Sequence, residues 1–345
     1  MSEKITIRDV AREAGVSPTT VSRALSRPGR VNLETATKVR EVAERLGYRT
    51  KNLEPQQDDV LRGMILTTTS DLKYSVFADF VTGMQKPCIH RNFILLTAIT
   101  EENRDLERST IVRMTSQVDG LILTSSRLSD STVRKAAQMR PTVVVNRLIN
   151  GVQSVISDDR PALSRIVRRL KALGHQSITY ITGPENSWQN GLRWQAMLVA
   201  CQQEQIKLRR IAGPNLATYV GGPLMDEPFV EFMRNPTTAV VLFNDIFALE
   251  FMERLQENGV RVPEQVSVIG IDDTPEAARS NPPLASVHIP REEMGADASN
   301  KLIAKILHTS DGSTTPVVRY STFIERASVG PAPQRPIAAV ESMTA

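Results

Sequence analysis

Four side chains of a short predicted helix near the N-terminus face away from its apolar positions: Pro18, Thr19, Ser22 and Arg23. The surrounding stretch, TIRDVAREAGVSPTTVSRAL, has apolar residues at helical spacing on both sides of Gly15. Thr6 and Asp9 have the spacing of a capping box, and Gly15 is suited to end the first helix. Ser17 can cap the second helix, which then begins at a proline. The pattern predicts a helix-turn-helix; the alternative is an ordinary helical hairpin on a protein surface.

Positive charge is concentrated in the same part of the chain. Residues 1–51 contain eleven Lys and Arg and six Asp and Glu, a net charge of +5. The remaining residues contain 31 basic and 32 acidic side chains, a net charge of −1. A basic patch confined to a helix-turn-helix is typical of a surface that binds the phosphates of DNA. The charge distribution therefore favours a DNA-binding motif over an ordinary helical hairpin on the protein surface.

A second group of polar residues follows the short apolar runs of residues 62–272. Because ligands of parallel sheets bind beyond the carboxyl ends of the strands, these positions are candidates for a binding site. Their side chains are rich in groups that hydrogen-bond to hydroxyls. The pairs are Ser70–Asp71, Ser125–Ser126, Asn146–Arg147, Gly183–Pro184, Asn244–Asp245 and Asp272–Asp273.

The elements that position these residues follow from the pattern of apolar runs. Asn32 can cap a third N-terminal helix that Gly47 ends, and the polar residues 50–59 indicate a linker. After the linker, β-branched runs alternate with helix-length segments in two rounds, 64–146 and 154–272. This alternation predicts parallel sheets with helices on both faces. The expected fold class is α/β, with two similar doubly wound subdomains behind an all-α front end.

Composition limits the other classes of protein. The chain has 345 residues with 41% hydrophobic and 23% charged content, which is typical of a soluble protein of two or three domains. No apolar run is long enough to span a membrane, and no export signal is visible, so we expect a cytoplasmic protein. Cys88 and Cys201 are far apart, and the four histidines are scattered. We therefore expect neither a disulfide nor a metal site, and no cofactor.

Taken together, several stretches closely resemble the lac-repressor type (LacI/GalR family) of bacterial transcription regulators. They include IRDVAREAGVSPTTVSRALS, VREVAERLGYR, LKALGHQSITYITGP, AVVLFNDIFALEFMERLQENGVRVPEQVSVIGIDDTP and PPLASVHIPREEMGADASNKL. The resemblance covers residues 5–51 and most of 62–328. It implies a DNA-binding headpiece (1–51), a linker or hinge (52–61), a periplasmic-binding-protein-like core (62–330) and a flexible tail (331–345). In such a core the chain crosses between two subdomains three times, and an effector lies in the cleft.

For the headpiece, the resemblance implies that the second helix enters the major groove of DNA. The residues expected to reach base edges are Pro18, Thr19, Ser22 and Arg23. Arg23 is the best candidate for a two-bond contact to guanine, whereas Pro18 can offer only apolar contact. Residues placed like the family's phosphate contacts are Thr6, Ser17, Thr20 and Asn32. For Thr20 and Ser22, local capping of the backbone is an equally reasonable interpretation.

The linker departs from the family pattern. A family hinge usually carries a leucine that wedges into the central minor groove of the operator, and such wedges bend DNA. Here the segment is KNLEPQQDDVLR, in which Leu53 is the only early leucine and Glu54, Asp58 and Asp59 would face phosphates. We therefore expect no ordinary hinge helix.

For the core, the resemblance implies an effector site in the cleft. Arg193 matches the family arginine that clamps ligand hydroxyls or carboxylates, and a carboxylate that converges with it suits vicinal hydroxyls. The expected effector-binding residues are Asp71, Tyr74, Phe77, Arg147, Trp188, Arg193, Asn244, Asp245 and Asp272. Phe77 could instead belong to the apolar core, and Arg193 could be only an ion-pair partner.

These features predict a repressor whose affinity for a near-palindromic DNA operator is controlled by a sugar, polyol or nucleoside effector. Because the tail has no leucine heptads, we expect a homodimer without a tetramerisation helix. The alternative is a cytoplasmic solute-binding or sensor module without operator-specific repression. An enzyme that uses Asp272 and Asp273 as an acid–base pair is disfavoured, because adjacent residues of a strand point to opposite faces. We predict no catalytic residues and no association with membranes.

Overall fold

Apolar residues at helical spacing build three helices in the first part of the chain, α1 (Ile7–Ala14), α2 (Pro18–Ser26) and α3 (Leu33–Leu46). The structure is a computed structural model that describes residues 5–26, 31–46, 61–185, 187–214, 224–334 and 337. The chain divides into two units, Met1–Leu61 and Arg62–Ala345. Except for Leu61, the predicted linker lies outside the described residues, as do Gly47 and the tail residues 338–345.

The helices of the first unit begin and end as the sequence predicts. The Asp9 carboxylate accepts hydrogen bonds from the Thr6 amide (2.9 Å) and the Thr6 hydroxyl (2.6 Å). Gly15 ends α1 in the left-handed conformation, at φ 68°, which a residue with a Cβ adopts only with strain. The inner faces of the helices share one small apolar core, whose buried members are Val10, Ala11, Ala14, Val21, Ala24, Ala36, Val39, Val42 and Ala43. The helix-turn-helix prediction is confirmed.

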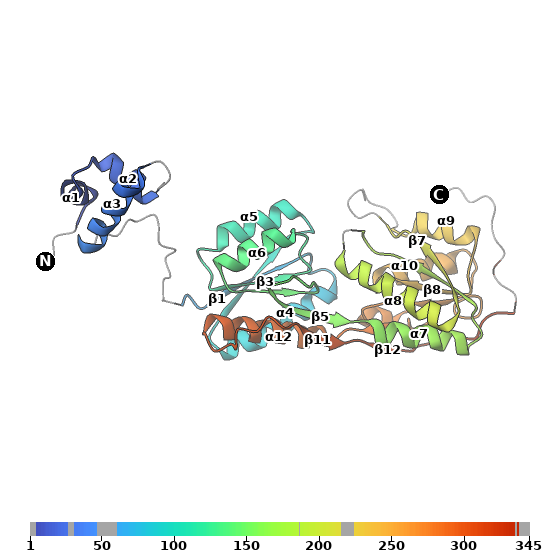
Figure 1. Ribbon diagram of the computed structural model, residues 1–345. Coiled ribbons are helices and arrows are strands. Elements are labelled where there is room, and N and C mark those ends of the chain that lie inside the picture. Colours follow the sequence, from blue (N-terminus) through green and yellow to red (C-terminus); the bar gives the residue numbers. More distant parts are fainter. Residues whose placement is uncertain are drawn as a thin grey trace. The chain divides into compact units, whose positions relative to one another are not determined.

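The second unit contains two lobes, which we call the N-lobe and the C-lobe. The N-lobe is built on a six-stranded parallel sheet in the order β11-β5-β4-β3-β1-β2. Its strands are β1 (Met64–Thr69), β2 (Ile94–Ile99), β3 (Gly120–Thr124), β4 (Thr142–Val145), β5 (Gln153–Asp158) and β11 (Val317–Tyr320). One face carries α5 (Arg104–Met114) and α6 (Asp130–Met139), and the other carries α4 (Ser75–His90) and α12 (Arg291–Ile306), as Figure 1 shows.

The C-lobe has a four-stranded parallel sheet in the order β7-β6-β8-β9. Its strands are β6 (Ser177–Ile181), β7 (Lys207–Ile211), β8 (Ala239–Leu242) and β9 (Ser267–Ile269). Its helices are α7 (Arg160–Ala172), α8 (Trp188–Glu204), α9 (Asp226–Arg234), α10 (Asp245–Glu257) and the short α11 (Pro275–Arg279). A separate antiparallel pair joins β10 (Ser286–His288) to β12 (Thr322–Ile324). The predicted pair of α/β subdomains is confirmed.

The chain crosses between the lobes at three places. These are residues 158–160, between β5 and α7; residues 289–291, between β10 and α12; and residues 320–322, between β11 and β12. The first crossing contains Asp159 and the second contains Arg291. Both side chains are therefore held where the two lobes meet. Asp159 directly follows β5 and Arg291 follows β10 by three residues, but neither is among the strand-end residues identified from the sequence.

Two helices of the N-lobe lie in unusually close contact. The contacts run in step along α4 and α12: Asp79 lies against Arg291, Phe80 against Gly295, and Cys88 against Ser299. The helices are therefore parallel and begin at the same end of the lobe. A Cβ on Gly295 would lie 2.2 Å from the Phe80 carbonyl oxygen, which is possible only if the helices separate.

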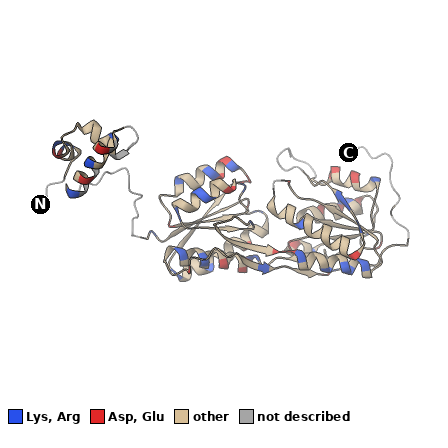
Figure 2. Ribbon diagram, viewed as in Figure 1, with Lys and Arg blue, Asp and Glu red and all other residues tan. Residues whose placement is uncertain are grey.

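The C-terminal segment differs from the flexible tail that the sequence predicts. The Ala332 amide donates a hydrogen bond to the Leu173 carbonyl (2.8 Å), and Ile337 packs against the apolar core beneath α9 and α10. These contacts attach at least this part of the tail to the C-lobe. Elsewhere on the core, helices such as α5 and α9 carry both acidic and basic residues (Figure 2), in agreement with the near-zero net charge of residues 52–345.

Candidate functional site

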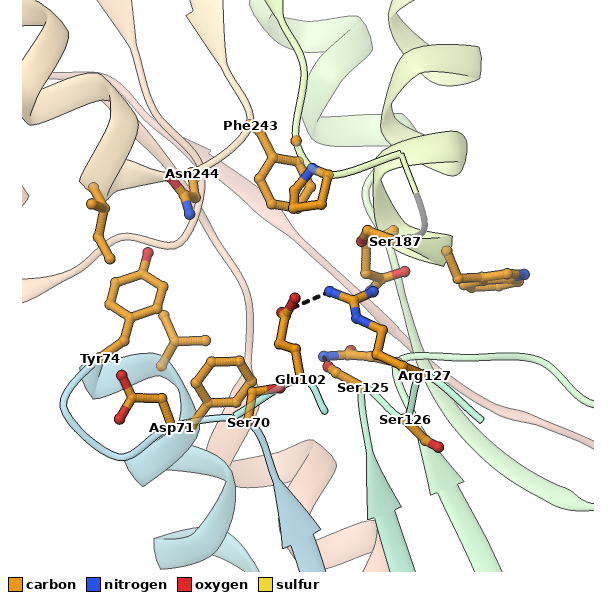
Figure 3. A pocket seen from close by; sticks show the side chains of 18 of the residues that line it. Ser70, Asp71, Tyr74, Glu102, Ser125, Ser126, Arg127, Ser187, Phe243 and Asn244 are labelled. Carbon is orange, nitrogen blue, oxygen red and sulfur yellow. Dashed lines mark hydrogen bonds and ion pairs between the residues drawn. The ribbon is translucent and has the colours of Figure 1, made fainter. Parts of the chain in front are cut away.

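A large cavity lies between the carboxyl ends of the strands of the two lobes. Its volume is about 1830 Å³, and residues from both lobes and from the second crossing line it. Figure 3 shows the N-lobe residues Ser70, Asp71, Tyr74, Ser125 and Ser126 on one side and the C-lobe residues Phe243, Asn244 and Ser187 on the other. The cavity therefore occupies the place at which parallel sheets bind ligands.

Arg193 anchors the C-lobe side of this cavity. It lies on α8, and its side chain is only 5% exposed. Its Nε donates to the Asp159 carboxylate (2.9 Å), its Nη1 donates to the Phe243 carbonyl (2.8 Å), and its guanidinium stacks on the Phe243 ring at 4.9 Å. A buried charge needs such partners, because desolvation of an unpaired guanidinium would cost several kcal/mol.

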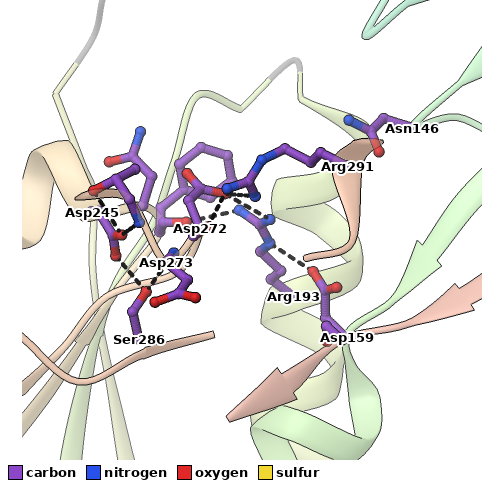
Figure 4. Close-up of polar contacts among 12 residues, drawn as sticks. Asn146, Asp159, Arg193, Asp245, Asp272, Asp273, Ser286 and Arg291 are labelled. Carbon is purple, nitrogen blue, oxygen red and sulfur yellow. Dashed lines mark hydrogen bonds and ion pairs between the residues drawn. The ribbon is translucent and has the colours of Figure 1, made fainter. Parts of the chain in front are cut away.

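Asp272 joins the two lobes at the same place (Figure 4). Its Oδ2 accepts a hydrogen bond from the Tyr74 hydroxyl (2.5 Å) of the N-lobe. Its Oδ1 faces two guanidiniums, at 3.6 Å from Arg291 Nη1 and 3.9 Å from Arg193 Nη2. Burial raises the pKa of Asp272, while the two arginines and the tyrosine hydroxyl favour its charged form. Oδ2 of Asp272 is therefore hydrogen-bonded, whereas Oδ1 lies beyond hydrogen-bond distance of the guanidiniums of Arg193 and Arg291.

Arg291 completes this group of charges. It is 4% exposed, its Nη2 donates to the Asp272 carbonyl, and its Nε approaches the Asp79 carboxylate at 3.4 Å. Its Nη1 is buried and has no hydrogen-bond partner among the described residues. The second oxygen of Asp159 is likewise buried without a partner. Buried donors and acceptors are nearly always paired in folded proteins, so Arg291 Nη1, whose residue lines the cavity, marks a place where a further polar group can bind; Asp159 does not line the cavity.

Backbone strain is concentrated around the cavity. Nine described residues other than glycine have positive φ, and three of them lie one or two residues after the end of a helix: Asn92, Gln205 and His308. The other six follow strands on the cavity side: Glu101, Glu102, Ser125, Asn146, Asp272 and Asp273. Because such conformations cost of order 1–3 kcal/mol each, they persist where the surrounding structure enforces them, and they cluster at ligand-binding sites.

Most of the effector-binding residues that the sequence predicts lie together in the cavity wall. They are Asp71, Tyr74, Phe77, Arg147, Trp188, Arg193, Asn244 and Asp272. Two of them are partly occupied by local bonds. The Asn244 side-chain oxygen accepts from the Phe247 amide (2.9 Å) and caps α10, so its NH₂ group is the part left to donate. Asp71 Oδ1 accepts from the Lys73 amide (2.9 Å).

Asp245 is the predicted residue that the structure does not bring into the cavity. It is fully buried, and its carboxylate accepts from the Ser286 hydroxyl (2.6 Å) and from the Thr274 amide and hydroxyl (2.8 and 3.1 Å). Burial, with a contribution from the charge of Asp272, raises its pKa to about 6. The expectation of an effector contact is corrected: Asp245 ties the start of α10 to the segment after β9.

Arg147 lines the cavity, but both of its terminal nitrogens already donate hydrogen bonds within the N-lobe. Its guanidinium donates to the carbonyls of Ser126 (3.0 Å) and Leu128 (2.5 Å) and to the Asp130 carboxylate (2.5 Å). These bonds hold the segment after β3 in place. The structure therefore favours a positioning role for Arg147 over the direct effector contact that the sequence predicts.

Sequence reasoning missed an ion pair on the N-lobe wall. The Arg127 guanidinium donates to the Glu102 carboxylate (2.7 Å), and Figure 3 shows this pair reaching into the cavity. Behind it, the buried Glu107 accepts from the Arg127 amide (3.3 Å) and from the Thr68 hydroxyl (3.2 Å). Glu102 follows its strand by three residues, so the strand-end rule does not reach it. Arg291 was missed because it lies at a crossing between the lobes, and Asp159 was missed although it directly follows β5.

Asp273 points away from Asp272 and has other partners. Its carboxylate accepts from Arg326 (2.5 Å) and lies 2.9 Å from His288 Nδ1. The two adjacent carboxylates therefore have separate partners and do not face one another, although both residues have positive φ and the segment is not an extended strand. In the described ranges, no three His, Cys, Asp or Glu side chains are placed to hold a metal ion. None of the described helices is both long and apolar enough to cross a bilayer.

On the N-terminal unit, the predicted base-reading residues lie on one exposed helix. Pro18, Thr19, Ser22 and Arg23 of α2 are all exposed. The predicted phosphate contacts also make local capping bonds, since Ser17 Oγ accepts from the Thr20 amide (3.1 Å) and Asn32 Oδ1 accepts from the Glu34 amide (3.0 Å). Such capping fixes the ends of the helices, and the roles of these residues toward DNA stay predictions.

Comparison with known proteins gives two family matches. Residues 6–51 match the model described as bacterial regulatory proteins, lacI family, and residues 167–329 match the model of a periplasmic binding protein-like domain. The HTH-type transcriptional repressor CytR of Escherichia coli is 28% identical to this chain over 319 residues, which cover 89% of this chain and 92% of CytR.

Two solved structures show the same fold along nearly the whole chain. The lac repressor dimer bound to operator and the anti-inducer ONPF matches with a TM-score of 0.69 at 22% identity, covering 95% of this chain and 100% of that chain. The complex of the transcriptional regulator CelR with cellobiose matches with a TM-score of 0.67 at 24% identity, covering 94% and 99%.

Proposed function

This chain belongs to the lacI family of bacterial regulatory proteins, and we propose that it is a transcriptional repressor controlled by a small hydroxylated effector. Its N-terminal unit would bind an operator, and the cavity between the lobes would bind the effector. The main observation in support of effector binding in this cavity is the group of charged side chains formed by Asp272, Arg193 and Arg291. The candidate effectors are sugars, polyols and nucleosides.

The distances in this group suit a hydroxyl. Asp272 Oδ1 lies 3.6 Å from Arg291 Nη1 and 3.9 Å from Arg193 Nη2, so each pair is too far apart for a direct hydrogen bond. A hydroxyl between them can donate to the carboxylate and accept from a guanidinium at the same time. Trp188, Phe77 and Phe243 also line the cavity and offer flat apolar surfaces to a sugar ring. The cellobiose bound to CelR, a protein of the same fold, agrees with this class of ligand.

Control of DNA binding requires that the effector distinguish two arrangements of the protein. An effector changes operator affinity only by the factor by which its own affinity differs between the DNA-competent and incompetent arrangements. A ligand held by Asp272 and Arg193 of the C-lobe and by residues of the N-lobe would favour one separation of the lobes over another. We propose the relative movement of the lobes as the element that the effector biases.

A thermal-shift screen of sugars, polyols and nucleosides against the full-length protein tests this proposal. A compound present at a hundred times its Kd stabilises the protein by about 2.7 kcal/mol, so a true effector is expected to raise the melting temperature clearly. The same compound is then expected to change the affinity for a duplex selected from random sequences. A hit that leaves duplex binding unchanged would favour the alternative, a solute sensor without operator-specific repression.

We also propose a homodimer, on the basis of exposed apolar residues around an edge strand. Ile94 and Ile99 of the edge strand β2 are 61% and 45% exposed, and Val112 of α5 is 65% exposed. Exposed apolar groups beside an unpaired strand edge favour association with another chain. A selected operator with two-fold symmetry is the form of DNA that such a dimer would bind.

Arg23→Ala is expected to remove most of the preference for the selected duplex over random duplex. Loss of one two-bond contact to guanine is worth about 1–3 kcal/mol, or roughly a 5- to 150-fold loss of discrimination. The measurement is a gel shift with both duplexes at fixed salt, because phosphate binding depends steeply on salt. Arg45→Ala, which changes an exposed arginine of α3 paired with Glu13, is the control and is expected to keep the preference. Full discrimination in Arg23→Ala would contradict the assignment of α2.

A further inference from the structure

Tyr74 forms a hydrogen bond that crosses the cleft. It caps the start of α4 in the N-lobe, and its hydroxyl donates to Asp272 Oδ2 of the C-lobe at 2.5 Å. The edge of its ring packs against Phe77, with ring centroids 6.3 Å apart. Burial and the charge of Asp272 raise the pKa of Tyr74 well above its usual range, so the hydroxyl keeps its proton and acts as a donor.

This bond occupies the carboxylate that the effector is proposed to use. Asp272 is 5% exposed, and its two oxygens have different surroundings. Oδ1 faces the gap in front of Arg193 and Arg291, whereas Oδ2 already accepts from Tyr74. A ligand with one hydroxyl can bind at Oδ1 alone. A ligand that presents two adjacent hydroxyls to the carboxylate in a two-bond contact uses both oxygens. At Oδ2 it meets the Tyr74 hydroxyl, and because Asp272 is almost fully buried, the two donors compete for the same exposed side of this oxygen.

We propose that the Tyr74 hydroxyl takes the place of one effector hydroxyl on Asp272, so that effector binding is an exchange in which Tyr74 is released. This inference rests on the proposed function of the cleft. It makes Tyr74 the residue that sets the affinity for ligands with vicinal hydroxyls. The exchange would also change how the two lobes are held together, because the Tyr74–Asp272 hydrogen bond between them is replaced by hydrogen bonds to the ligand.

The neighbouring contacts support an exchange rather than a simple addition. Arg291 also reaches both lobes, since it donates to the Asp272 carbonyl and approaches Asp79 of α4 at 3.4 Å. Its unpartnered Nη1 and the 3.6 Å gap to Oδ1 offer a place for one ligand oxygen. The second, adjacent oxygen would then lie next to Oδ2, where the tyrosine hydroxyl now lies.

Tyr74→Phe distinguishes this exchange from a simple addition of the ligand and from a merely structural role of Tyr74. The variant keeps the ring and its contact with Phe77, and it removes only the competing hydroxyl. We expect it to bind a vicinal-diol ligand more tightly, by about ten-fold, because a hydrogen bond to a charged group no longer has to be broken. The effector-free variant is expected to melt at a lower temperature, because Asp272 loses a donor. Tighter binding together with lower stability is a combination that a merely structural role of Tyr74 would not produce.

The measurement is calorimetric titration of the full-length protein with cytidine and 2′-deoxycytidine, which differ only in the vicinal diol of the sugar, and with ribose, cellobiose and myo-inositol. Tyr320→Phe is the matched control, since Tyr320 is 65% exposed and does not line the cavity. It is expected to bind as the wild type does. In Tyr74→Phe, the gain in affinity is expected for the vicinal diols and not for 2′-deoxycytidine, which has none.

Three outcomes are distinguishable. Tighter binding of a diol by Tyr74→Phe, with Tyr320→Phe unchanged, supports the exchange. Equal or weaker binding by Tyr74→Phe overturns the exchange and leaves the proposed function standing, because the cleft still binds the ligand. If neither these probes nor the wider screen bind any of the three proteins, the proposed function fails, and the exchange fails with it.

Discussion

Arg193→Ala is expected to lower the free energy of unfolding of the core by about 3–5 kcal/mol and to abolish effector binding. The substitution leaves the carboxylates of Asp159 and Asp272 buried without the guanidinium that lies between them, and removal of one partner of a buried ion pair has an effect of this size. Urea unfolding followed by circular dichroism measures the first effect, and calorimetric titration with a hit from the screen measures the second.

Two further variants make this result interpretable. Arg169→Ala removes an exposed arginine of α7 that pairs with Glu325, and it is expected to change stability by less than about 1 kcal/mol. Arg193→Lys keeps a positive charge near the two carboxylates, so it is expected to be more stable than the alanine variant. Because lysine cannot reproduce the geometry of a guanidinium, the variant is still expected to bind the effector weakly. Wild-type stability and binding in Arg193→Ala would contradict the site as described.

Gly295→Ala is expected to destabilise the core by about 3 kcal/mol, although alanine favours helices. The added Cβ would lie 2.2 Å from the Phe80 carbonyl oxygen and 2.9 Å from the Met84 amide nitrogen, so α12 must move away from α4. Overpacking of this kind costs typically 1–3 kcal/mol and occasionally more, which exceeds the gain of about 1 kcal/mol in helix propensity. Urea unfolding gives the difference directly.

A glycine in another helix of the same unit provides the control. Gly191 lies in α8, and a Cβ built on it meets no atom within 4 Å. Gly191→Ala is therefore expected to stabilise the protein by up to about 1 kcal/mol. The opposite signs of the two effects are the prediction. If both substitutions stabilise the protein, the close contact between α4 and α12 is not as described.

The parts of the fold that could be predicted are those in which local pattern and tertiary structure agree. Runs such as MILTTT and TVVV are buried on both faces of a parallel sheet, so they contain apolar and β-branched residues throughout. The strand β7 (KLRRI) escaped prediction because it is an edge strand, where charged side chains reach water. The helix α12 was not predicted either, because the small residues that allow its close contact with α4 interrupt the apolar pattern.

The candidate site was predictable to the extent that strand ends determine it. Asp272 and Asn244 were found because they follow buried strands of one sheet, and both line the cavity. Asp245 was misplaced because it begins α10, and the first turn of that helix directs its side chain toward Ser286 instead of the cavity. Arg291 could not be found from local pattern, because it begins α12 after a crossing between the lobes. Asp159 follows β5 directly, so the strand-end rule reaches it, but it was not named among the candidates.

The contact of α4 with α12 through Gly83 and Gly295 determines how the N-lobe can respond to a ligand. Tyr74 stands at the start of α4 and Arg291 at the start of α12, and both hold Asp272. With backbone against backbone, neither helix can slide or tilt without the other. If an effector binds at Asp272 as proposed, we expect a change in its bonds to move the two helices together, as one stiff body.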